Sequence, residues 1–350
     1  MRKISFASAI LEAQEHLLAH DPSVFVIGLG VPTNAGVFGT TVGLVEKFGP
    51  DRVLDMPASE NGMTGMGVGA AIAGMRPIMV HNRVDFAVLA MEPIVNQAAK
   101  WFYTYGGEVS CPLTVRLIIG RGWGQGPQHS QSLQAWFAHV PGLKVVMPTT
   151  PSDAKQLLIA AVNDPAPVIV LEHRWLYDTV GPVAAQSTGE KLGESRLMVE
   201  GTDVTLVSCS YMTLECVEAA RLLANIGVSA SVVDLRTVSP LDMTTILGSV
   251  EHTRRLVVAD TGHTWFGISG EILARVAEAG INLLSRPLRY GLPNAPTPTT
   301  AALSDVFYPR AIDIARGVAS EIMGANAPLI DDPDLGKPLD WPQRNFTGPY

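Results

Sequence analysis

The sequence predicts an α/β protein with two doubly wound domains, each built on a parallel sheet between layers of helices. Three observations support this prediction. Short apolar segments of strand length alternate with longer segments of helical periodicity, as in parallel α/β folds. A polar stretch over residues 181–200 interrupts the alternation, which then resumes. The chain has 350 residues, enough for two domains with separate cores.

The first half of the chain contains four expected helices and four expected strands. Ile10, Leu11 and Leu17 recur at helical spacing, and the apolar end of the third strand, 117–119, suits burial on both faces of a sheet. The expected helices are 8–19, 60–74, 91–105 and 152–162, and the expected strands are 23–27, 77–80, 113–119 and 168–171.

The second half repeats the pattern after the polar stretch. Gly227 follows the helix expected over 214–226 and is typical of a C-terminal cap. Another helix is expected over 269–278, and strands over 204–208, 228–233 and 256–259. We therefore expect a first domain over 1–180, a linker over 181–200, a second domain over 201–335 and a tail over 336–350.

Composition narrows the classes of function. The net charge is −8, and no cluster of Lys and Arg of the nucleic-acid-binding type is present, so no nucleic-acid partner is expected. Three cysteines without a Cys-x-x-Cys pair argue against a disulfide framework or a zinc site. We see no signal peptide and no apolar run long enough to cross a membrane, so a cytoplasmic protein is expected. The 47% of hydrophobic residues fits either a large subunit interface or a large core.

Two glycine-rich segments follow strands. Gly28-Leu29-Gly30 resembles a dinucleotide-binding loop, but Thr33 stands where the third glycine is required. The alternating glycines of 120–126 are typical either of a loop that another group approaches closely or of a flexible surface loop.

Glu60 is the strongest candidate for chemistry. After Asp55 it is the only ionisable side chain in residues 55–74, and it begins a helix of mainly Gly, Ala and Met. A helix N-terminus favours a carboxylate. Each glycine costs the helix roughly 1 kcal/mol relative to Ala, which predicts close approach of another backbone. The alternative is a charge at the start of an ordinary interface helix.

Two further segments carry polar groups suited to a site. His129 lies among hydroxyl and amide side chains, which can hold an imidazole in one tautomer near neutral pH. Residues 81–86 follow a strand, at the end where open α/β sheets bind ligands. The alternatives are a hydrogen-bonded loop histidine and a polar loop with one buried aromatic residue.

Together these segments resemble the decarboxylase beta subunits of 2-oxo acid dehydrogenase complexes (pyruvate, branched-chain or acetoin type) in the transketolase-like family. The resemblance covers about residues 3–320 in the same order of motifs. It is carried by 55–74, 85–86 with 94–100, 128–131 with 137–146, 201–207 and 233–242. It implies a thiamine-diphosphate pyrimidine-binding domain followed by a transketolase C-terminal-like domain.

The resemblance also implies roles for individual residues. Thiamine diphosphate would be the cofactor, with Glu60 hydrogen-bonded to its aminopyrimidine ring and Phe86 stacked against that ring. Ala58 would contact the cofactor through its backbone, and Asn82 would line the pocket. His129 would stabilise or protonate intermediates and help to guide acyl transfer to a lipoyl group.

A motif that the chain lacks implies its partners. Relatives hold the diphosphate and Mg²⁺ with a Gly-Asp-Gly motif, which does not occur in this sequence. The resemblance therefore implies an alpha subunit that holds the metal in an α₂β₂ heterotetramer. The implied activity is decarboxylation of a 2-oxo acid and acyl transfer to lipoamide, with a lipoyl acyltransferase as a further partner.

The sequence departs from the family pattern in several places. Leu29-Gly30 replaces an acidic pair thought to couple the two active sites, so coupling is left open. Arg83 and Arg121 add charge and, with His129, are candidates for binding the substrate. They also favour an alternative, a two-component transketolase-like enzyme that transfers a two-carbon or acyl unit to an aldehyde. Asp164 is present but Ala166 replaces an Asn near a structural potassium ion, whose presence is also left open.

Overall fold

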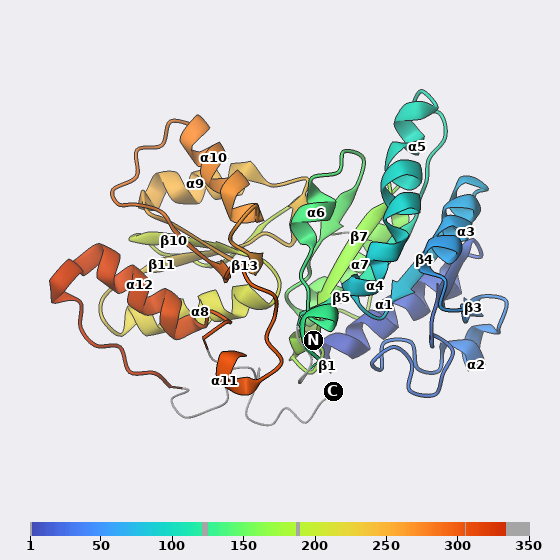
Figure 1. Cartoon of the computed structure of the whole chain (residues 1–350), viewed down its shortest axis with the longest axis horizontal. Coiled ribbons are helices and arrows are strands. Elements are labelled where there is room, and N and C mark those ends of the chain that lie inside the picture. The colour runs from blue at the N-terminus through green and yellow to red at the C-terminus, as the bar shows by residue number, and fades with distance from the viewer. Residues whose placement is uncertain (1, 121–124, 187–189, 305, 334–350) are drawn as a thin grey trace. The chain divides into compact units, whose positions relative to one another are not determined.

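The computed structural model describes residues 2–120, 125–186, 190–304 and 306–333 (Figure 1). They form two compact units. The first unit contains residues up to 120 and residues from 129 to 192. The second contains residues from 193 onward together with the segment 125–128. Each unit is an α/β structure, which confirms the predicted fold class.

A parallel sheet forms the centre of the first unit. Its strands are β2 (Val24–Gly28), β3 (Val53–Leu54), β4 (Arg76–His81), β5 (Thr114–Ile119), β6 (Lys144–Val146) and β7 (Val168–His173). They lie in the order β6-β7-β5-β4-β2-β3, and each neighbouring pair is parallel. Because all strands run in one direction, their carboxyl ends meet at one edge of the sheet.

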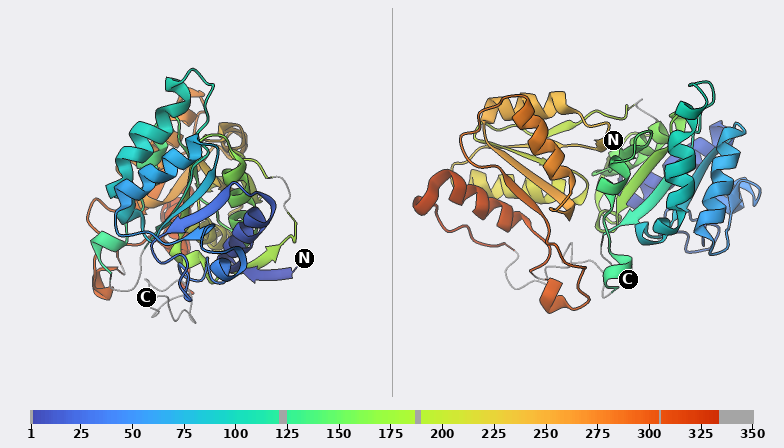
Figure 2. Two further views of the ribbon diagram at one scale, coloured as in Figure 1. Left: turned by 90° about the vertical axis from the view of Figure 1, so that its right-hand side faces the viewer. Right: turned by 45° about the horizontal axis from the view of Figure 1, so that its top comes forward.

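Helices cover both faces of this sheet (Figures 1 and 2). On one face α1 (Phe6–His20) packs against α7 (Pro151–Asn163). On the other, α3 (Glu60–Ile72) packs against η1 (Val88–Ala90) and η2 (Glu92–Ala98), and α5 (Ala99–Thr104) continues from η2. The shorter elements are α2 (Leu44–Phe48), α4 (Val84–Ala87), η3 (Pro127–His129), α6 (Gln134–Ala138), η4 (Arg174–Leu176) and the antiparallel pair β1 (Arg2–Ser5) and β8 (Val180–Val183).

An ion pair lies in the core of the first unit. Arg116 in β5 and Glu172 in the neighbouring strand β7 are both fully buried. The Arg116 Nε–Glu172 Oε1 distance is 2.6 Å and the Nη2–Oε2 distance is 2.9 Å. Arg116 also donates to Gln14 Oε1 at 2.8 Å and Thr40 Oγ1 at 3.0 Å. The hydrogen bonds of this guanidinium offset the cost of burying its charge.

The second unit has a five-stranded sheet with the order β14-β13-β10-β11-β9, in which only β9 is antiparallel to its neighbour. In Figure 1, α8 and α12 lie on one face of this sheet and α9 and α10 on the other. The strands are β9 (Arg196–Val199), β10 (Val204–Ser208), β11 (Ala230–Asp234), β13 (Leu256–His263) and β14 (Leu288–Leu292). The helices are α8 (Tyr211–Ala224), α9 (Met243–Thr253), α10 (Ile268–Glu278) and α12 (Ala311–Met323); short β12 (Thr237–Ser239), α11 (Ala301–Ser304) and η5 (Gly324–Asn326) complete the unit.

The structure differs from the sequence-based expectation at two segments. Residues 181–200, expected as a linker, contain most of β8 and all of β9. Strand β8 alternates exposed and buried residues over only four positions, one of them Gly and one Pro, so its period is too short to recognise. The single helix expected over 91–105 is instead a π-helical segment, η2, followed by α5. The tail 336–350 lies outside the described residues.

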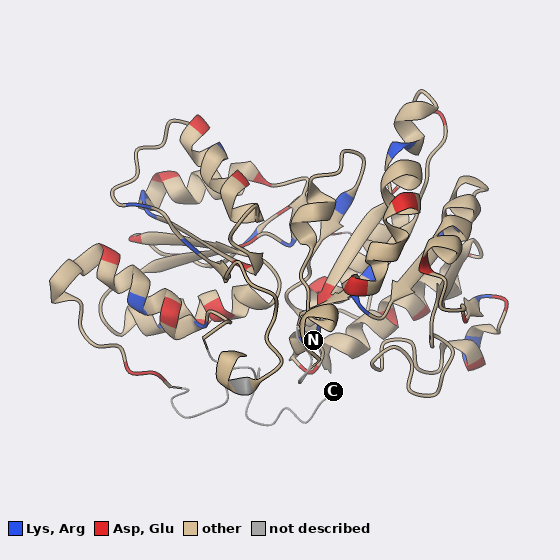
Figure 3. Ribbon diagram, viewed as in Figure 1, with Lys and Arg blue, Asp and Glu red and all other residues tan. Residues whose placement is uncertain are grey.

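Charged residues are interspersed over the elements of both units in the coloured part of Figure 3. Within the described part of the chain, no helix is both long and apolar enough to span a bilayer. Cys111, Cys209 and Cys216 are buried as free thiols.

Candidate active site

Glu60 is the first residue of α3, and the loop that precedes it follows strand β3. Its side chain is partly buried, and its carboxylate accepts no hydrogen bond from the described residues. The next residue, Asn61, donates from Nδ2 to the Leu89 carbonyl at 3.3 Å, which ties the start of α3 to η1. The carboxylate is therefore held at a helix N-terminus with its oxygens available to a ligand.

The loop before Glu60 is fixed by Asp55. The Oδ1 atom of Asp55 accepts hydrogen bonds from the Gly30 amide at 2.8 Å and from the Met56 amide at 2.9 Å. These bonds join the loop after β3 to the loop after β2. Ala58 lies in the fixed loop and is exposed, so its backbone is accessible.

The residues that follow β4 lie at the same edge of the sheet. His81, the last residue of β4, is hydrogen-bonded through Nε2 to Thr64 Oγ1 in α3 at 3.2 Å. Burial lowers the pKa of His81 to about 4, so this imidazole is neutral near pH 7. Asn82 comes next, and its Oδ1 atom is buried with no hydrogen-bond partner among the described residues.

The structure brings Phe86 and His129 together. Phe86 belongs to α4, and His129 ends the short turn η3. Their ring centroids are 5.5 Å apart and the ring planes are at 87°, an edge-to-face contact. Both side chains are partly exposed, so a ligand can reach both rings.

A polar contact holds the His129 segment in place. Asp85 Oδ1 accepts from Gln131 Nε2 at 2.8 Å and from the Gln131 amide at 3.4 Å, while the Gln131 carbonyl accepts from the Gly120 amide at 3.2 Å. Sequence reasoning singled out the segments around Asp85 and Gln131 but gave neither residue a role. Their pairing is a long-range contact that no local pattern indicates.

Of the two arginines that were candidates for substrate binding, only Arg83 lies within the described residues. Arg83 is 3% exposed and donates from Nη1 to the Gly120 carbonyl at 3.0 Å, so its guanidinium lies inside the unit at the carboxyl ends of β4 and β5. Arg121 lies outside the described residues. Arg174, at the end of β7, is also fully buried near Arg83, and sequence reasoning missed it.

The glycines of α3 meet different surroundings. A Cβ at Gly67 would lie 3.2 Å from Met79 Cε, so this glycine allows close packing within the chain. A Cβ at Gly65 or Gly69 would meet nothing within 4 Å. Met66 between them is 46% exposed. The expected close approach of a backbone is therefore not seen within this chain: side chains approach Gly67, and Gly65 and Gly69 leave a smooth surface.

Comparison with known proteins assigns the family. Residues 2–179, which include every candidate described above, match the family described as "Transketolase, pyrimidine binding domain". Residues 193–314 match "Transketolase, C-terminal domain". The chain belongs to the transketolase family.

Its relatives within the family are beta subunits. The chain is 40% identical to the acetoin:2,6-dichlorophenolindophenol oxidoreductase subunit beta of Cupriavidus necator, over 92% of this chain and 98% of the relative. It is 39% identical to the pyruvate dehydrogenase E1 component subunit beta-1, mitochondrial, of Oryza sativa subsp. japonica, over 90% and 86%. A solved structure titled "Split gene transketolase, inactive beta4 tetramer" has the same fold, with a TM-score of 0.75 and 22% identity over 91% of this chain and 99% of that chain.

Membership in this family implies thiamine diphosphate as the cofactor, and the similarity to beta subunits implies an alpha subunit as the partner. The residues present fit the pyrimidine half of that cofactor. Glu60 offers a carboxylate to a ring nitrogen, Phe86 offers an aromatic face, and the buried Asn82 Oδ1 atom is an acceptor without a partner among the described residues.

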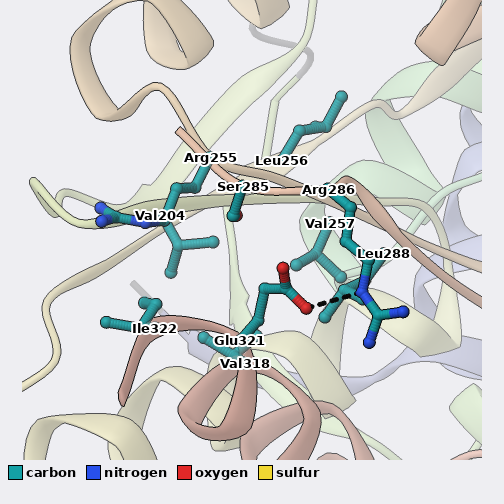
Figure 4. Close-up of a pocket in the computed structure, with 10 residues that line it drawn as sticks. All are labelled: Val204, Arg255, Leu256, Val257, Ser285, Arg286, Leu288, Val318, Glu321 and Ile322. Carbon is teal, nitrogen blue, oxygen red and sulfur yellow. Dashed lines mark hydrogen bonds and ion pairs between the residues drawn. The ribbon is translucent and has the colours of Figure 1, made fainter. Parts of the chain in front are cut away.

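The second unit has a hollow that we do not assign to this site. It lies beside Val204, Leu256 and Leu288, at the amino ends of β10, β13 and β14, where Arg286 pairs with Glu321 at 2.8 Å (Figure 4). Ligands of open parallel sheets bind at the opposite, carboxyl ends of the strands.

Proposed function

We propose that this chain supplies Glu60, Phe86 and His129 to an active site shared with an alpha subunit. In this proposal the complete enzyme decarboxylates a 2-oxo acid and transfers the acyl group to lipoamide. The supporting observation is the open Glu60 carboxylate at the start of α3, at the same sheet edge as the edge-to-face pair of Phe86 and His129.

When bound, thiamine diphosphate would supply the carbon nucleophile and accept the electrons released on decarboxylation. The chain's own residues would bind and orient it. Glu60 would accept a hydrogen bond from the protonated aminopyrimidine ring nitrogen, a charge-assisted contact favoured at a helix N-terminus. Phe86 would present its ring to the aminopyrimidine, and Asn82 Oδ1 and the Ala58 backbone would add polar contacts. His129 would donate or accept a proton beside the reacting carbon.

The diphosphate and Mg²⁺ would be held by the alpha subunit, because this sequence has no Gly-Asp-Gly motif. We propose an α₂β₂ heterotetramer in which the smooth surface at Gly65 and Gly69 receives a neighbouring helix. A lipoyl acyltransferase would be the next partner. We further propose a cytoplasmic location, consistent with three buried free thiols.

A structural potassium ion stays a prediction. The Asp164 carboxylate is already bonded, to Lys144 Nζ at 2.5 Å and to the Ala166 amide at 2.9 Å. Among the described residues, the Asp164 carbonyl accepts a hydrogen bond only from Arg76 Nη1, at 3.5 Å, so this carbonyl could serve as a ligand for potassium. Comparing activity and thermal stability in potassium and sodium salts tests this point.

The alternative is a two-component transketolase-like enzyme with an aldehyde acceptor. It is favoured by the buried cation Arg83, which suits a substrate with a phosphate or carboxylate group. The two functions differ in the molecule that receives the transferred unit, lipoamide or an aldehyde. Only the first function also needs an electron acceptor.

The deciding experiment uses the chain co-purified with its alpha subunit, with thiamine diphosphate and Mg²⁺. Reduction of lipoamide or 2,6-dichlorophenolindophenol is followed with pyruvate, branched 2-oxo acids and acetoin, and the Glu60→Gln complex is the control. Turnover with a 2-oxo acid that disappears in the control supports the proposal. Turnover that requires an added aldehyde and reduces neither lipoamide nor 2,6-dichlorophenolindophenol would favour the alternative.

A further inference from the structure

Arg174 is a fully buried cation. It follows β7, and its exposed fraction is 0%. None of its three guanidinium nitrogens has a hydrogen-bond partner among the described residues. An uncompensated buried guanidinium is costly, and buried polar groups in proteins are nearly always bonded. This side chain therefore needs an acceptor from outside the described residues.

A second buried arginine lies on the same aromatic ring. The Arg174 guanidinium carbon lies 4.4 Å from the ring centroid of Phe38, and that of Arg83 lies 6.0 Å from it. Phe38 has a φ of +50°, a strained conformation for a bulky residue. The backbone is thus held in an unfavourable state while the ring contacts both cations, an arrangement typical of a built site.

Glu172 is fully engaged, and Asp85 is engaged through one of its two oxygens. Both oxygens of Glu172 bind Arg116, and Glu172 Oε2 also accepts from the Tyr177 hydroxyl at 2.9 Å. Asp85 attracts Arg83 through space. Its Oδ1 atom binds Gln131, whereas its Oδ2 atom is buried without a hydrogen-bond partner among the described residues. Asp85 is not among the groups that shift the pKa of Arg174. After β2, where a carboxylate could reach this edge, the chain has Leu29 and Gly30.

Both arginines keep their charge near pH 7. Burial, and then repulsion by Arg83, lower the pKa of Arg174 to about 10. The neighbouring His173 adds no charge, because burial and Arg83 lower its pKa to about 3. Two guanidinium groups therefore converge at the carboxyl ends of β4 and β7, the sheet edge at which open α/β folds bind ligands.

We propose that Arg174 and Arg83 form an oxyanion-binding site that takes the carboxylate or phosphate group of a small molecule. A planar guanidinium fork matches either group with two parallel hydrogen bonds. The anion belongs either to the substrate itself or to a separate inorganic phosphate. Assigning it to the substrate rests on the proposed function, whereas anion binding by this chain does not.

The binding experiment uses thermal unfolding of the full chain with sodium pyruvate, sodium phosphate or neutral acetoin, against sodium chloride at equal ionic strength. The wild type is compared with Arg174→Met, Arg174→Lys and the control Arg275→Met. Arg275 is exposed in the second unit and pairs with Glu271 of its own helix, so this control removes one charge without touching the site.

We expect pyruvate or phosphate to raise the unfolding midpoint of the wild type and of Arg275→Met, and acetoin to have no effect. Arg174→Met should lose this response, with binding weaker by roughly ten- to hundredfold. Arg174→Lys keeps the charge but not the planar guanidinium group, and it should bind pyruvate or phosphate roughly tenfold more weakly. If Arg174→Met fails to fold, Arg174→Lys is used for the comparison with wild type. The proposal is overturned if neither anion exceeds chloride in the wild type, or if the folded Arg174 variants respond like the wild type.

Kinetics of the complex with the alpha subunit then identify the source of the anion. If the substrate's carboxylate occupies the site, Arg174→Lys should raise the KM for the 2-oxo acid about tenfold and leave the KM for acetoin unchanged. If inorganic phosphate occupies it, the KM for the 2-oxo acid should stay constant in Arg174→Lys while phosphate binding is weakened. An inactive wild-type complex that still binds the anions would contradict the proposed function and leave the anion site supported.

Discussion

The imidazole of His129 meets the ring of Phe86 edge-on, with 5.5 Å between the ring centroids and 87° between the ring planes. The two residues come from different segments, α4 after strand β4 and the turn η3 after strand β5. Their contact places an aromatic face and a titratable group side by side. The first unit therefore forms this contact within one chain, as the proposed active site shared with an alpha subunit requires.

Changing Glu60 to Gln should slow the chemical step and leave folding of the chain unaffected. The amide fits the same space, and the wild-type carboxylate accepts no hydrogen bond from the described residues, so folding and assembly should survive. Removing a charge-assisted hydrogen bond to the cofactor should slow deprotonation of its reactive carbon by roughly 10²- to 10³-fold. Hydrogen–deuterium exchange at that carbon in the assembled complex measures this step. Exchange at the wild-type rate would make Glu60 a helix-start charge only.

Asp85 should act as a positioning residue for His129. Asp85→Leu removes the acceptor for Gln131 and should lower kcat about fivefold, since one hydrogen bond is worth about 1 kcal/mol, while cofactor affinity stays unchanged. Asp85→Asn retains an oxygen acceptor and should recover most of the activity. Titration of the cofactor alongside steady-state kinetics distinguishes this role from a general loss of structure. Equal losses in both variants would show that the carboxylate's charge, not its hydrogen bond, is needed.

Assembly should depend on the smooth face of α3. Gly69→Leu adds a side chain where nothing lies within 4 Å in this chain, so the isolated chain should fold normally and fail to form the α₂β₂ complex. Gly248→Leu is a matched control, since Gly248 lies in helix α9 with equally open surroundings. Light scattering of the co-expressed subunits measures the assembly. A Gly69→Leu tetramer of wild-type stability would exclude this face as the interface.

The isolated wild-type chain should bind thiamine diphosphate weakly and show no turnover.

Acid should destabilise the chain through two buried histidines. Burial lowers the folded-state pKa of His81 to about 4 and that of His173 to about 3, against 6.5 for an ordinary imidazole. Between these values the unfolded state binds more protons, so the free energy of unfolding falls as pH drops below 6.5, by up to about 1.4 kcal/mol per pH unit for each histidine. Above 6.5 this contribution is constant. Urea unfolding at several pH values measures the free energy of unfolding. Below pH 6.5 this free energy should fall less steeply with decreasing pH for His81→Gln than for wild type, and an identical pH dependence would contradict the assignment.

Local sequence patterns were sufficient to predict the helices, strands and motifs. They were insufficient to predict contacts between side chains that lie far apart in the sequence. The small residues after Glu60 predicted α3, and the apolar run ending at Ile119 predicted β5 although Arg116 interrupts it. The burial of Arg116 could not be foreseen, because its partner Glu172 lies in another strand. Arg174 was missed for the same reason, since nothing in its neighbours along the chain indicates that it contacts Phe38.

The hydrogen bonds of Arg116 also constrain the order in which the first unit can form during synthesis. The guanidinium binds Gln14, Thr40 and Glu172, so its partners span nearly the whole unit, and the only carboxylate among them is made last. A nascent chain that ends before β7 would have to bury this arginine without a counter-charge, which strongly disfavours a native-like intermediate. The ribosome must therefore release residue 172 from its exit tunnel before the sheet can close, and shorter N-terminal fragments should remain unfolded.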